Sequence, residues 1–467
     1  MPGSNERPGD CADSPKDGFV FGWILNVCYL TILLVMSPVL LWKRWRWGKY
    51  RRGWPEKFLG SVPKLPVPTR DRIWLHAVSV GEVLQLPQVV DRLRLKRPDV
   101  EFVISTTTET GYDVATKQFP ENLVVFFPLD LTWSVSRAIE RIQPTLVVLV
   151  ELEIWPNFVL TVRDRRIPLA LINGRMSEKS FRGYRLIPKL CDRLFRCFDL
   201  VAVQNDEYGH RFEELGCSSE AVTVTGSIKF DGVQADRDNF QTTDLGKFFR
   251  IQEGEVVFIA GSTQEPEEEF ALSVYVELQA TFPQLRFVLV PRHPERASEV
   301  AALVRRFGCP LISRTGRHDH HAGTGSAVGL LDTVGELNAC WGLAEIAFVG
   351  GSFTDRGGQN MMEPAAYGAA VCFGPNVWNF RQVVDLMLAK DAARIVATKH
   401  ELKDFVAEML TSQEIRQQLG KRAQHLVQSQ QGATDRTVSL LCSLLDPRNS
   451  KNSQIASSVR IETLPTE

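Results

Sequence analysis

The amino-acid sequence predicts an α/β protein with two Rossmann-like, doubly wound domains in series, preceded by one membrane-spanning helix. Three observations lead to this fold class. Short apolar runs alternate with helix-like stretches, which is typical of a parallel sheet with helices on both faces. This alternation stops in a polar stretch at residues 231–253 and then starts again. Residues 19–42 contain no charged side chain, and 467 residues are enough for two domains.

Each half of the chain contains a series of strand-like segments. In the first half they lie at residues 73–80, 101–108, 124–130, 145–155, 167–174 and 199–205, and in the second half at residues 256–263, 286–293, 328–333, 345–352 and 370–375. We therefore expect one domain over residues 43–235 and another over residues 236–445, followed by a polar tail at 446–467. Two such domains in series place a ligand cleft between them, at the carboxyl ends of the strands.

Residues 19–42 are long enough to cross a bilayer, for which about 20 apolar residues suffice. Four acidic and two basic residues precede this segment and no small-residue cleavage site follows it, which favours an uncleaved anchor over a secretory signal. Six Lys and Arg residues crowd positions 43–52, so the positive-inside rule leaves the short tail 1–18 on the non-cytoplasmic side and the rest in the cytoplasm. These cations would also attract an anionic leaflet. The alternative is an apolar helix buried against the protein.

Composition and cysteine spacing limit the function. The chain carries a net charge of -1, so as a whole it is not built to bind nucleic acid. Its nine cysteines are scattered singly without a Cys-x-x-Cys pair, which argues against a disulfide framework or a zinc site and for a reducing compartment. We predict no metal at residues 236–238 (Asp-Arg-Asp), which follow no strand, or at residues 318–321 (His-Asp-His-His), which lie in a polar loop.

Acidic side chains follow two strands of the first half. Glu82 lies in a strand–glycine–helix turn, where the positive end of a helix dipole keeps a carboxylate ionised, as a general base must be. The structural alternative is that Glu82 only stabilises this dipole. Glu151 and Glu153 close an otherwise apolar run, and carboxylates there are costly unless they are solvated or partnered. Strand alternation points both toward the crevice, and pairing with Arg175 is the structural alternative.

Basic and glycine-rich stretches indicate two anionic ligands. Residues 173–196 contain seven Lys or Arg side chains, which form either a solvated helix face or a dock for lipid phosphates; the candidate acceptor-binding residues are Arg175, Arg182 and Arg185. In the second half, glycines at 350–351 and 357–358 follow a strand and lead into a helix, which predicts a phosphate cradle without a metal. Glu363 could bond a ribose hydroxyl, and Arg292, after another strand, a single phosphate. Together these features indicate a nucleotide.

At these residues the chain resembles the Kdo (3-deoxy-D-manno-octulosonic acid) transferase family of lipopolysaccharide biosynthesis. The resemblance covers roughly residues 20–445 in order. Its segments are residues 76–82 (HAVSVGE), 106–111 (TTTETG), 151–157 (ELEIWPN), 173–177 (NGRMS), 225–231 (TGSIKFD), 261–263 (GST), 291–296 (PRHPER), 332–337 (DTVGEL), 350–352 (GGS) and 357–363 (GGQNMME). So many colinear motifs are highly specific when taken together.

The resemblance implies a metal-independent, inverting glycosyltransferase of the GT-B type, without a cofactor, that moves Kdo from CMP-Kdo onto a lipid A precursor (a tetra-acylated disaccharide phosphate). The N-terminal domain then receives the lipid, the C-terminal domain holds CMP-Kdo, and the enzyme works at the cytoplasmic face of the inner membrane. By the same resemblance Glu82 is the catalytic base, with Glu153 (or the nearby Glu151) and Lys229 as transition-state helpers. The residues that it implies for CMP binding are Pro291, Arg292, Val334, Gly335, Glu336, Asn360 and Glu363.

Two residues depart from the family pattern. Gln264 and Gln359 stand where many members carry histidine, and a neutral amide donates a hydrogen bond but carries no charge. This departure concerns donor affinity and pH response rather than the reaction class. Two other functions fit the same features: a transferase of this fold that uses another nucleotide sugar on a membrane lipid, and a non-catalytic membrane scaffold.

Overall fold

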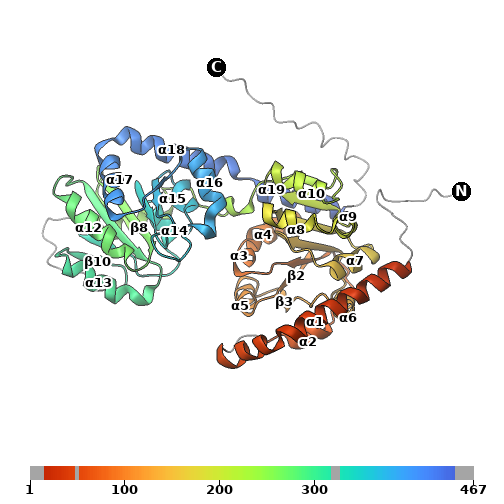
Figure 1. Ribbon diagram of the computed structural model, residues 1–467. Helices are drawn as coiled ribbons and strands as arrows, with labels where there is room; N and C mark the ends of the chain where they lie inside the picture. The colour runs from red at the N-terminus through yellow and green to blue at the C-terminus, as the bar shows by residue number, and fades with distance from the viewer. Residues whose placement is uncertain (1–14, 48–51, 317–326, 447–467) are drawn as a thin grey trace, which may run out of the picture. The chain divides into compact units, whose positions relative to one another are not determined.

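The computed structural model describes residues 15–47, 52–316 and 327–446. The tails at 1–14 and 447–467 and the loop segment 318–321 lie outside the described residues. The chain forms two compact units: the first contains the residues up to Asp231 and from Gly432 onward, and the second contains Gly232–Gln431. Each unit is built on one parallel sheet with helices packed against it (Figure 1). The α/β fold class predicted from the alternating apolar runs is confirmed.

The first unit contains, among the described residues, a seven-stranded sheet in the order β3-β2-β1-β4-β5-β6-β7. Its strands are β1 (Arg72–His76), β2 (Glu101–Thr106), β3 (Leu123–Phe126), β4 (Leu146–Val150), β5 (Leu169–Gly174), β6 (Leu200–Val203) and β7 (Val222–Val224). Every residue of β1, β4 and β5 is buried, because both faces of the sheet are covered, and this explains their continuous apolar sequences. The strand order reverses between β1 and β4, which makes the ends of these two strands the topological switch point.

The second unit contains, in its described part, another seven-stranded parallel sheet in the order β10-β11-β9-β8-β12-β13-β14. Its strands are β8 (Val256–Thr263), β9 (Leu285–Pro291), β10 (Leu311–Ser313), β11 (Val328–Leu330), β12 (Ile346–Val349), β13 (Ala370–Phe373) and β14 (Arg394–Ile395). Here the order reverses between β8 and β12. Ligands of open α/β sheets bind at such reversals, so each unit has one place where chemistry is expected.

Helices surround the two sheets. Those of the first unit are α1 (Pro15–Trp47), α2 (Trp54–Leu59), α3 (Val80–Val83), α4 (Leu86–Lys96), α5 (Glu109–Gln118), α6 (Thr132–Ile142), α7 (Pro156–Asp164), α8 (Glu178–Tyr184), α9 (Pro188–Phe195), α10 (Asp206–Glu214), η1 (Ile228–Phe230) and α19 (Ala433–Leu445). Those of the second unit are α11 (Phe240–Phe248), α12 (Glu267–Gln279), η2 (Pro294–Arg296), α13 (Ala297–Arg306), α14 (Leu337–Trp341), α15 (Met362–Ala366), η3 (Trp378–Phe380), α16 (Arg381–Ala389), α17 (Lys399–Thr411) and α18 (Gln413–Gln430).

The last helix, α19, belongs to the first unit although the sequence places it at the end of the second domain. It packs against α4 (Figure 1), and its apolar side chains Val438 and Leu441 lie in the core on one face of the first sheet. The Asp231 carboxylate accepts hydrogen bonds from the backbone N–H groups of Gly432 and Thr434, so it caps the first turn of α19. Apolar patterning shows that a helix is half-buried, but it does not show which sheet the helix covers.

Helix α1 is longer than the anchor predicted from the sequence. Its segment Gly22–Val39 has a mean hydropathy of 1.8, and only 11% of that segment is buried. By length and composition alone, α1 can cross a membrane, and no other helix in the described residues can. Its large apolar side chains are mostly exposed, which argues against the alternative of a helix buried in the protein.

One side of α1 is nevertheless attached to the first unit by polar groups. The Asn26 amide donates to the Thr132 hydroxyl at 2.8 Å and accepts from the Thr132 backbone N–H at 3.0 Å. The Tyr29 hydroxyl donates to Asp130 at 3.0 Å. Burial raises the pKa of Asp130 to about 6, against the hydrogen bonds that it accepts from the backbone and from Tyr29. These contacts dock α1 on the start of α6.

Candidate active site

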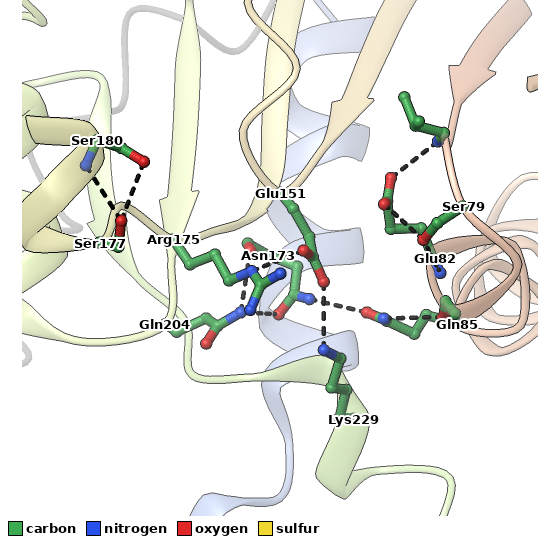
Figure 2. A network of polar contacts seen from close by, with 12 residues as sticks. Ser79, Glu82, Gln85, Glu151, Asn173, Arg175, Ser177, Ser180, Gln204 and Lys229 are labelled. Carbon is green, nitrogen blue, oxygen red and sulfur yellow. Dashed lines mark hydrogen bonds and ion pairs between the residues drawn. The ribbon is translucent and has the colours of Figure 1, made fainter. Parts of the chain in front are cut away.

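The carboxyl ends of β1 and β4 lie side by side in the first sheet, where His76 pairs with Leu149. Glu82 follows β1, and Glu151 and Glu153 follow β4, so all three predicted carboxylates come from the topological switch point. Lys229 comes from the 3-10 turn η1. Figure 2 shows Glu151 and Lys229 facing each other, with Glu82 on the neighbouring turn. The acidic residues predicted from the sequence therefore lie at the end of the sheet where open parallel sheets bind their ligands.

Glu82 is held in place by the turn from which it comes. Ser79 caps α3: its hydroxyl accepts from the backbone N–H of Glu82 at 3.3 Å and donates to Glu82 Oε1 at 2.7 Å. The backbone N–H of Val78 donates to Glu82 Oε2 at 2.8 Å. This arrangement is a variant of the capping box, in which the carboxylate bonds the residue before the N-cap. The Ser-x-x-Glu spacing of residues 79–82 signals it in the sequence, and we missed it there. Each carboxylate oxygen keeps a second lone pair, so the group can still accept a proton.

The pKa of Glu82 is raised above its ordinary value. Burial is the largest cause, since only 8% of the residue is exposed, and the charge of Glu151 adds to it. The hydrogen bonds from Ser79 and Val78 act in the opposite direction. A carboxylate with a raised pKa is a stronger base than an exposed one, while its position fixes the direction in which it accepts a proton.

Glu82, Glu151 and Glu153 form a carboxylate cluster, and within it Glu151 is the residue that forms ion pairs. Its carboxylate lies 2.6 Å from Nε of Arg175 and 3.2 Å from Nζ of Lys229, so the pairing with Arg175 considered from the sequence is confirmed. Its backbone has a φ of +62°, in the left-handed region that non-glycine residues rarely adopt. This turn ends β4 at Val150, whereas the sequence predicts a strand as far as residue 155. Strained backbone of this kind is common at functional sites.

Glu153 has a different environment. The indole N–H of Trp155 donates to its Oε2 at 2.9 Å, and within the described residues no cation pairs with it. Burial, followed by the charges of Glu82 and Glu151, raises the pKa of Glu153 to about 7, although the bond from Trp155 lowers it. At neutral pH the Glu153 carboxyl is therefore protonated in a substantial share of molecules, while Glu151 is held by two cations.

Asn173 supports the loop that carries Lys229, a role that we did not predict. It is fully buried at the end of β5 and has a φ of +52°. Its amide donates to Gln85 at 2.8 Å, and its Oδ1 accepts from the Gln204 side chain at 3.1 Å and from the Ile228 backbone at 3.3 Å (Figure 2). An Asn-Gly pair at a strand end, as at residues 173–174, was the available signal, because asparagine tolerates left-handed backbone.

The three arginines predicted to bind the acceptor have separate partners. Arg175 lies on Glu151. Arg182 pairs with Glu178 one turn earlier on α8 at 2.8 Å, and Arg185 lies over the ring of Phe181 at 5.6 Å. Both are exposed, so their partners hold them only weakly. Only Arg175 reaches the carboxylate cluster.

In the second unit, the residues predicted to bind CMP follow β9, β11 and β12. Arg292 follows Pro291 at the end of β9; its backbone N–H donates to Thr263 at 2.9 Å and its side chain is exposed. Asn360 donates to Glu363 at 3.0 Å. Burial raises the pKa of Glu363, while the hydrogen bond from Asn360 and the charge of Arg292 act to lower it. Arg292 and Asn360 therefore both act on the carboxyl group of Glu363.

The turn 334–336 presents backbone to solvent. Val334 is 84% exposed, and Gly335 has a φ of +91° with open space where a Cβ would lie. Glu336 is bonded by the Thr333 hydroxyl and by Arg314 at 2.9 Å. Burial acts to raise the pKa of Glu336, but these two partners outweigh burial and the net pKa is lowered. Glu336 is therefore an anion that is already neutralised within the protein.

Of the two glycine-rich turns predicted to form the phosphate cradle, the first, at residues 350–352, is wrong, and the second, at residues 357–360, stays a prediction. The backbone N–H groups of Gly351, Ser352 and Phe353 all donate to the carboxylate of Glu267, at 2.7, 2.8 and 2.9 Å. An internal anion thus fills the site that was expected to receive a phosphate. From the sequence, Glu267 is one of three consecutive acids that begin α12, and nothing in that run shows which of them points inward.

No group of three or more His, Cys, Asp or Glu side chains among the described residues is arranged to hold a metal ion. In the Asp-Arg-Asp segment at residues 236–238, the middle residue, Arg237, anchors the chain. Its guanidinium donates hydrogen bonds to the carbonyls of Tyr367, Gly342 and Ala344.

Comparison with known proteins identifies relatives. A family model described as "3-Deoxy-D-manno-octulosonic-acid transferase (kdotransferase)" matches residues 49–232. The chain is 30% identical to the 3-deoxy-D-manno-octulosonic acid transferase of Haemophilus influenzae over 89% of this chain and 95% of that protein. It is also 30% identical to the enzyme of the same name from Bordetella pertussis, over 88% of this chain and 98% of that protein. Among solved structures, UDP-GlcNAc 2-epimerase from Neisseria meningitidis, bound to UDP-GlcNAc, shares the fold with a TM-score of 0.53 at 13% identity, over 80% of this chain and 100% of that one.

Proposed function

This chain belongs to the 3-deoxy-D-manno-octulosonic acid transferase family, and we propose from this premise that it moves Kdo from CMP-Kdo onto a lipid A precursor with inversion at the anomeric carbon. It is a glycosyltransferase of lipopolysaccharide biosynthesis with the two-domain GT-B fold. The observation that carries the proposal is the Glu82 carboxylate, fixed by Ser79 and Val78 at the switch point of the first sheet.

In the proposed reaction Glu82 accepts the proton of a sugar hydroxyl on the acceptor lipid as that oxygen attacks the anomeric carbon of Kdo. The bond between this carbon and the phosphate oxygen breaks on the opposite face, and CMP leaves with the electron pair. The raised pKa of Glu82 supports its use as a base. Lys229 contributes a cation that Glu151 orients, and Glu153 contributes a carboxyl whose pKa lies near neutrality. These two are the proposed transition-state helpers.

The second unit is the proposed binding site for the CMP part of the donor. CMP carries a single phosphate, which one arginine and a few neutral donors can neutralise. Arg292 supports this role, because it is exposed and its charge acts on Glu363, which forms a half-buried pair with Asn360. Pro291, Val334, Gly335 and Glu336 complete the proposed contacts. Since the family resemblance implies no metal, EDTA should leave turnover unchanged.

The acceptor is proposed to reach the first unit from the membrane. Helix α1 would cross the inner membrane once, with the tail 1–18 outside and the catalytic units on the cytoplasmic face. Insertion would separate Asn26 and Tyr29 from Thr132 and Asp130, so the contacts between these residues would exist only in the chain outside a membrane. The apolar segment Gly22–Val39 and the exposed Arg44 and Arg46 at the end of α1 support this placement. Arg175, Arg182 and Arg185 are the candidates for contacts with the phosphates of the lipid.

The test is mass spectrometry of the lipid product after the full chain is incubated with CMP-Kdo and a tetra-acylated precursor. The expected product is heavier than the acceptor by one or more Kdo residues, and Glu82→Gln is the matched inactive control. A lipid that stays unmodified would contradict the proposal. Thermal shifts would then identify a transferase with another donor, because the nucleotide of the true donor stabilises the protein and CMP does not.

A further inference from the structure

Two glutamine side chains lie on either side of Gly351, at the switch point of the second sheet. Gln264 directly follows β8, and Gln359 lies in the loop between β12 and α15. A Cβ at Gly351, the second residue after β12, would lie 3.2 Å from Nε2 of Gln359 and 3.6 Å from Nε2 of Gln264. The amide groups of residues that are distant in the sequence are therefore neighbours. Gly351 has a φ of +66°, so glycine is favoured there and the space stays open to the amides.

Both amides are available to a ligand. Each residue is half-buried, and within the described residues neither side-chain amide has a hydrogen-bond partner. Polar groups in partly buried positions are normally satisfied, by protein, water or a ligand. Together the two amides offer four N–H donors and two carbonyl acceptors at the carboxyl end of the sheet.

The buried carboxylate of Glu267 holds the two loops at this point in one arrangement. Besides the three bonds from residues 351–353, it accepts from the backbone N–H of Gln264 at 3.0 Å. Glu267 is fully buried, and a Cβ at Gly350 would lie 2.8 Å from its Oε2 and 2.6 Å from Cα of Thr263. The loops after β8 and β12 are thus packed tightly around one anion, which gives the amide pair a rigid support.

The hydrogen-bonding groups of the Gln264 and Gln359 amides match the sugar-acid part of the donor better than its phosphate. A phosphate diester only accepts hydrogen bonds and is matched best by a cation, and Arg292 supplies one after the adjacent strand β9. A sugar acid presents a carboxylate that accepts and hydroxyls that both donate and accept. Two neutral amides match this mixture, because each has a donor and an acceptor side.

We propose that Gln264 and Gln359 bind the carboxylate and hydroxyl groups of the sugar-acid part of the donor, and so determine which activated sugar the site accepts. This assignment rests on the proposed function. It predicts that the pair contributes to the binding of CMP-Kdo and not to that of CMP. It also predicts donor recognition that does not depend on the protonation of these two side chains, since an amide does not titrate.

The test compares Gln264→Ala and Gln359→Ala in the full chain with Gln417→Ala, a matched control on the exposed surface of α18. Each switch-point variant should raise the KM for CMP-Kdo roughly tenfold or more, as expected for the loss of a hydrogen bond to a charged group. The Kd for CMP, measured by calorimetry, should stay within about twofold, and the control should leave both unchanged. An equal rise in the Kd for CMP would move the pair to the nucleotide site and overturn the proposal, as would an unchanged KM.

Gln264→His provides a second, independent readout. An imidazole with an ordinary pKa near 6.5 becomes a cation as the pH falls, so the KM of this variant for CMP-Kdo should decrease from pH 8 to pH 5.5 relative to that of the wild type. The same KM ratio at both pH values would show that position 264 does not face the sugar carboxylate. Failure of the proposed function is recognised separately, because the wild-type chain itself would then not transfer Kdo from CMP-Kdo.

Discussion

The Nζ of Lys229 lies 3.2 Å from a carboxylate oxygen of Glu151, whose other oxygen is bound by Arg175 at 2.6 Å. Glu151 therefore orients Lys229, a cation from the 3-10 turn η1, and it also raises the pKa of Glu82 through its own charge. The proposed base and one proposed helper are thus coupled through Glu151, a residue that need not touch substrate.

Glu82→Gln should lower the rate of Kdo transfer by about 10²–10⁴-fold, the usual cost of removing a general base. Glutamine keeps the size of the side chain but cannot take up the proton. Binding of CMP should not change, since the nucleotide is assigned to the second unit. The measurement is single-turnover transfer at saturating donor, with calorimetry of CMP and a thermal melt in parallel.

Ser79→Ala is the companion to that variant, because it removes the cap of α3 and one hydrogen bond to Glu82 but keeps the carboxylate itself. Loss of an N-cap costs roughly 0.5–2 kcal/mol of stability. If Glu82→Gln transfers Kdo at nearly the wild-type rate while both variants lower the melting temperature, Glu82 is only a capping residue. Glu153 would then be the next carboxylate to test.

Glu151→Gln should shift the acidic limb of the pH–rate profile to lower pH. Burial and the charge of Glu151 both raise the pKa of Glu82, and a base is active only when it is ionised. Removal of the Glu151 charge lowers the pKa of Glu82, so activity persists to lower pH. The profile of kcat/KM between pH 4 and 8 measures this, with Glu207→Gln on the exposed surface of α10 as control. A limb that stays in place, or moves to higher pH, would show that Glu82 is not the titrating group.

Arg292→Ala should weaken CMP binding by roughly 1.5–3 kcal/mol, the range for a hydrogen bond to a charged group. Arg292 is exposed and close enough to affect the pKa of Glu363. Arg306→Ala, an exposed arginine on α13, is the control. Calorimetry that finds equal CMP affinity in the two variants would remove Arg292 from the phosphate site.

Removal of residues 1–42 should leave a folded protein that binds CMP but no longer sediments tightly with membranes. Any remaining membrane binding through basic side chains should disappear at high salt. In the absence of a membrane the truncated protein should be less stable than the full chain, because Thr132 and Asp130 lose their bonds to Asn26 and Tyr29. The variant Asn26→Leu in the full chain measures part of this loss. A truncated chain that does not fold would mean that α1 is part of the core.

The two sheets, and the strand ends that carry the candidate site, were predictable because buried parallel strands are continuous apolar runs. The short edge strands β7, β10 and β14 were missed, since two or three residues form no pattern that differs from a loop. The candidate site was predictable where an acidic side chain follows a strand within a few residues, as Glu82 and Glu151 do. It was not predictable where tertiary contacts decide the role, as for Asn173 and Glu267, whose partners lie in other segments of the chain.

The return of the chain to the first unit has a consequence for synthesis. The second unit is one continuous piece, Gly232–Gln431, whereas the first unit lacks a covering helix until α19 has been made. On a ribosome the second unit can therefore finish folding earlier. The apolar face of α4 remains uncovered until Val438 and Leu441 have been synthesised. A chain that stops shortly after Gln431 would retain every proposed catalytic and donor-binding side chain. It would nevertheless expose the core beneath Glu82, and Asp231 would have no helix to cap.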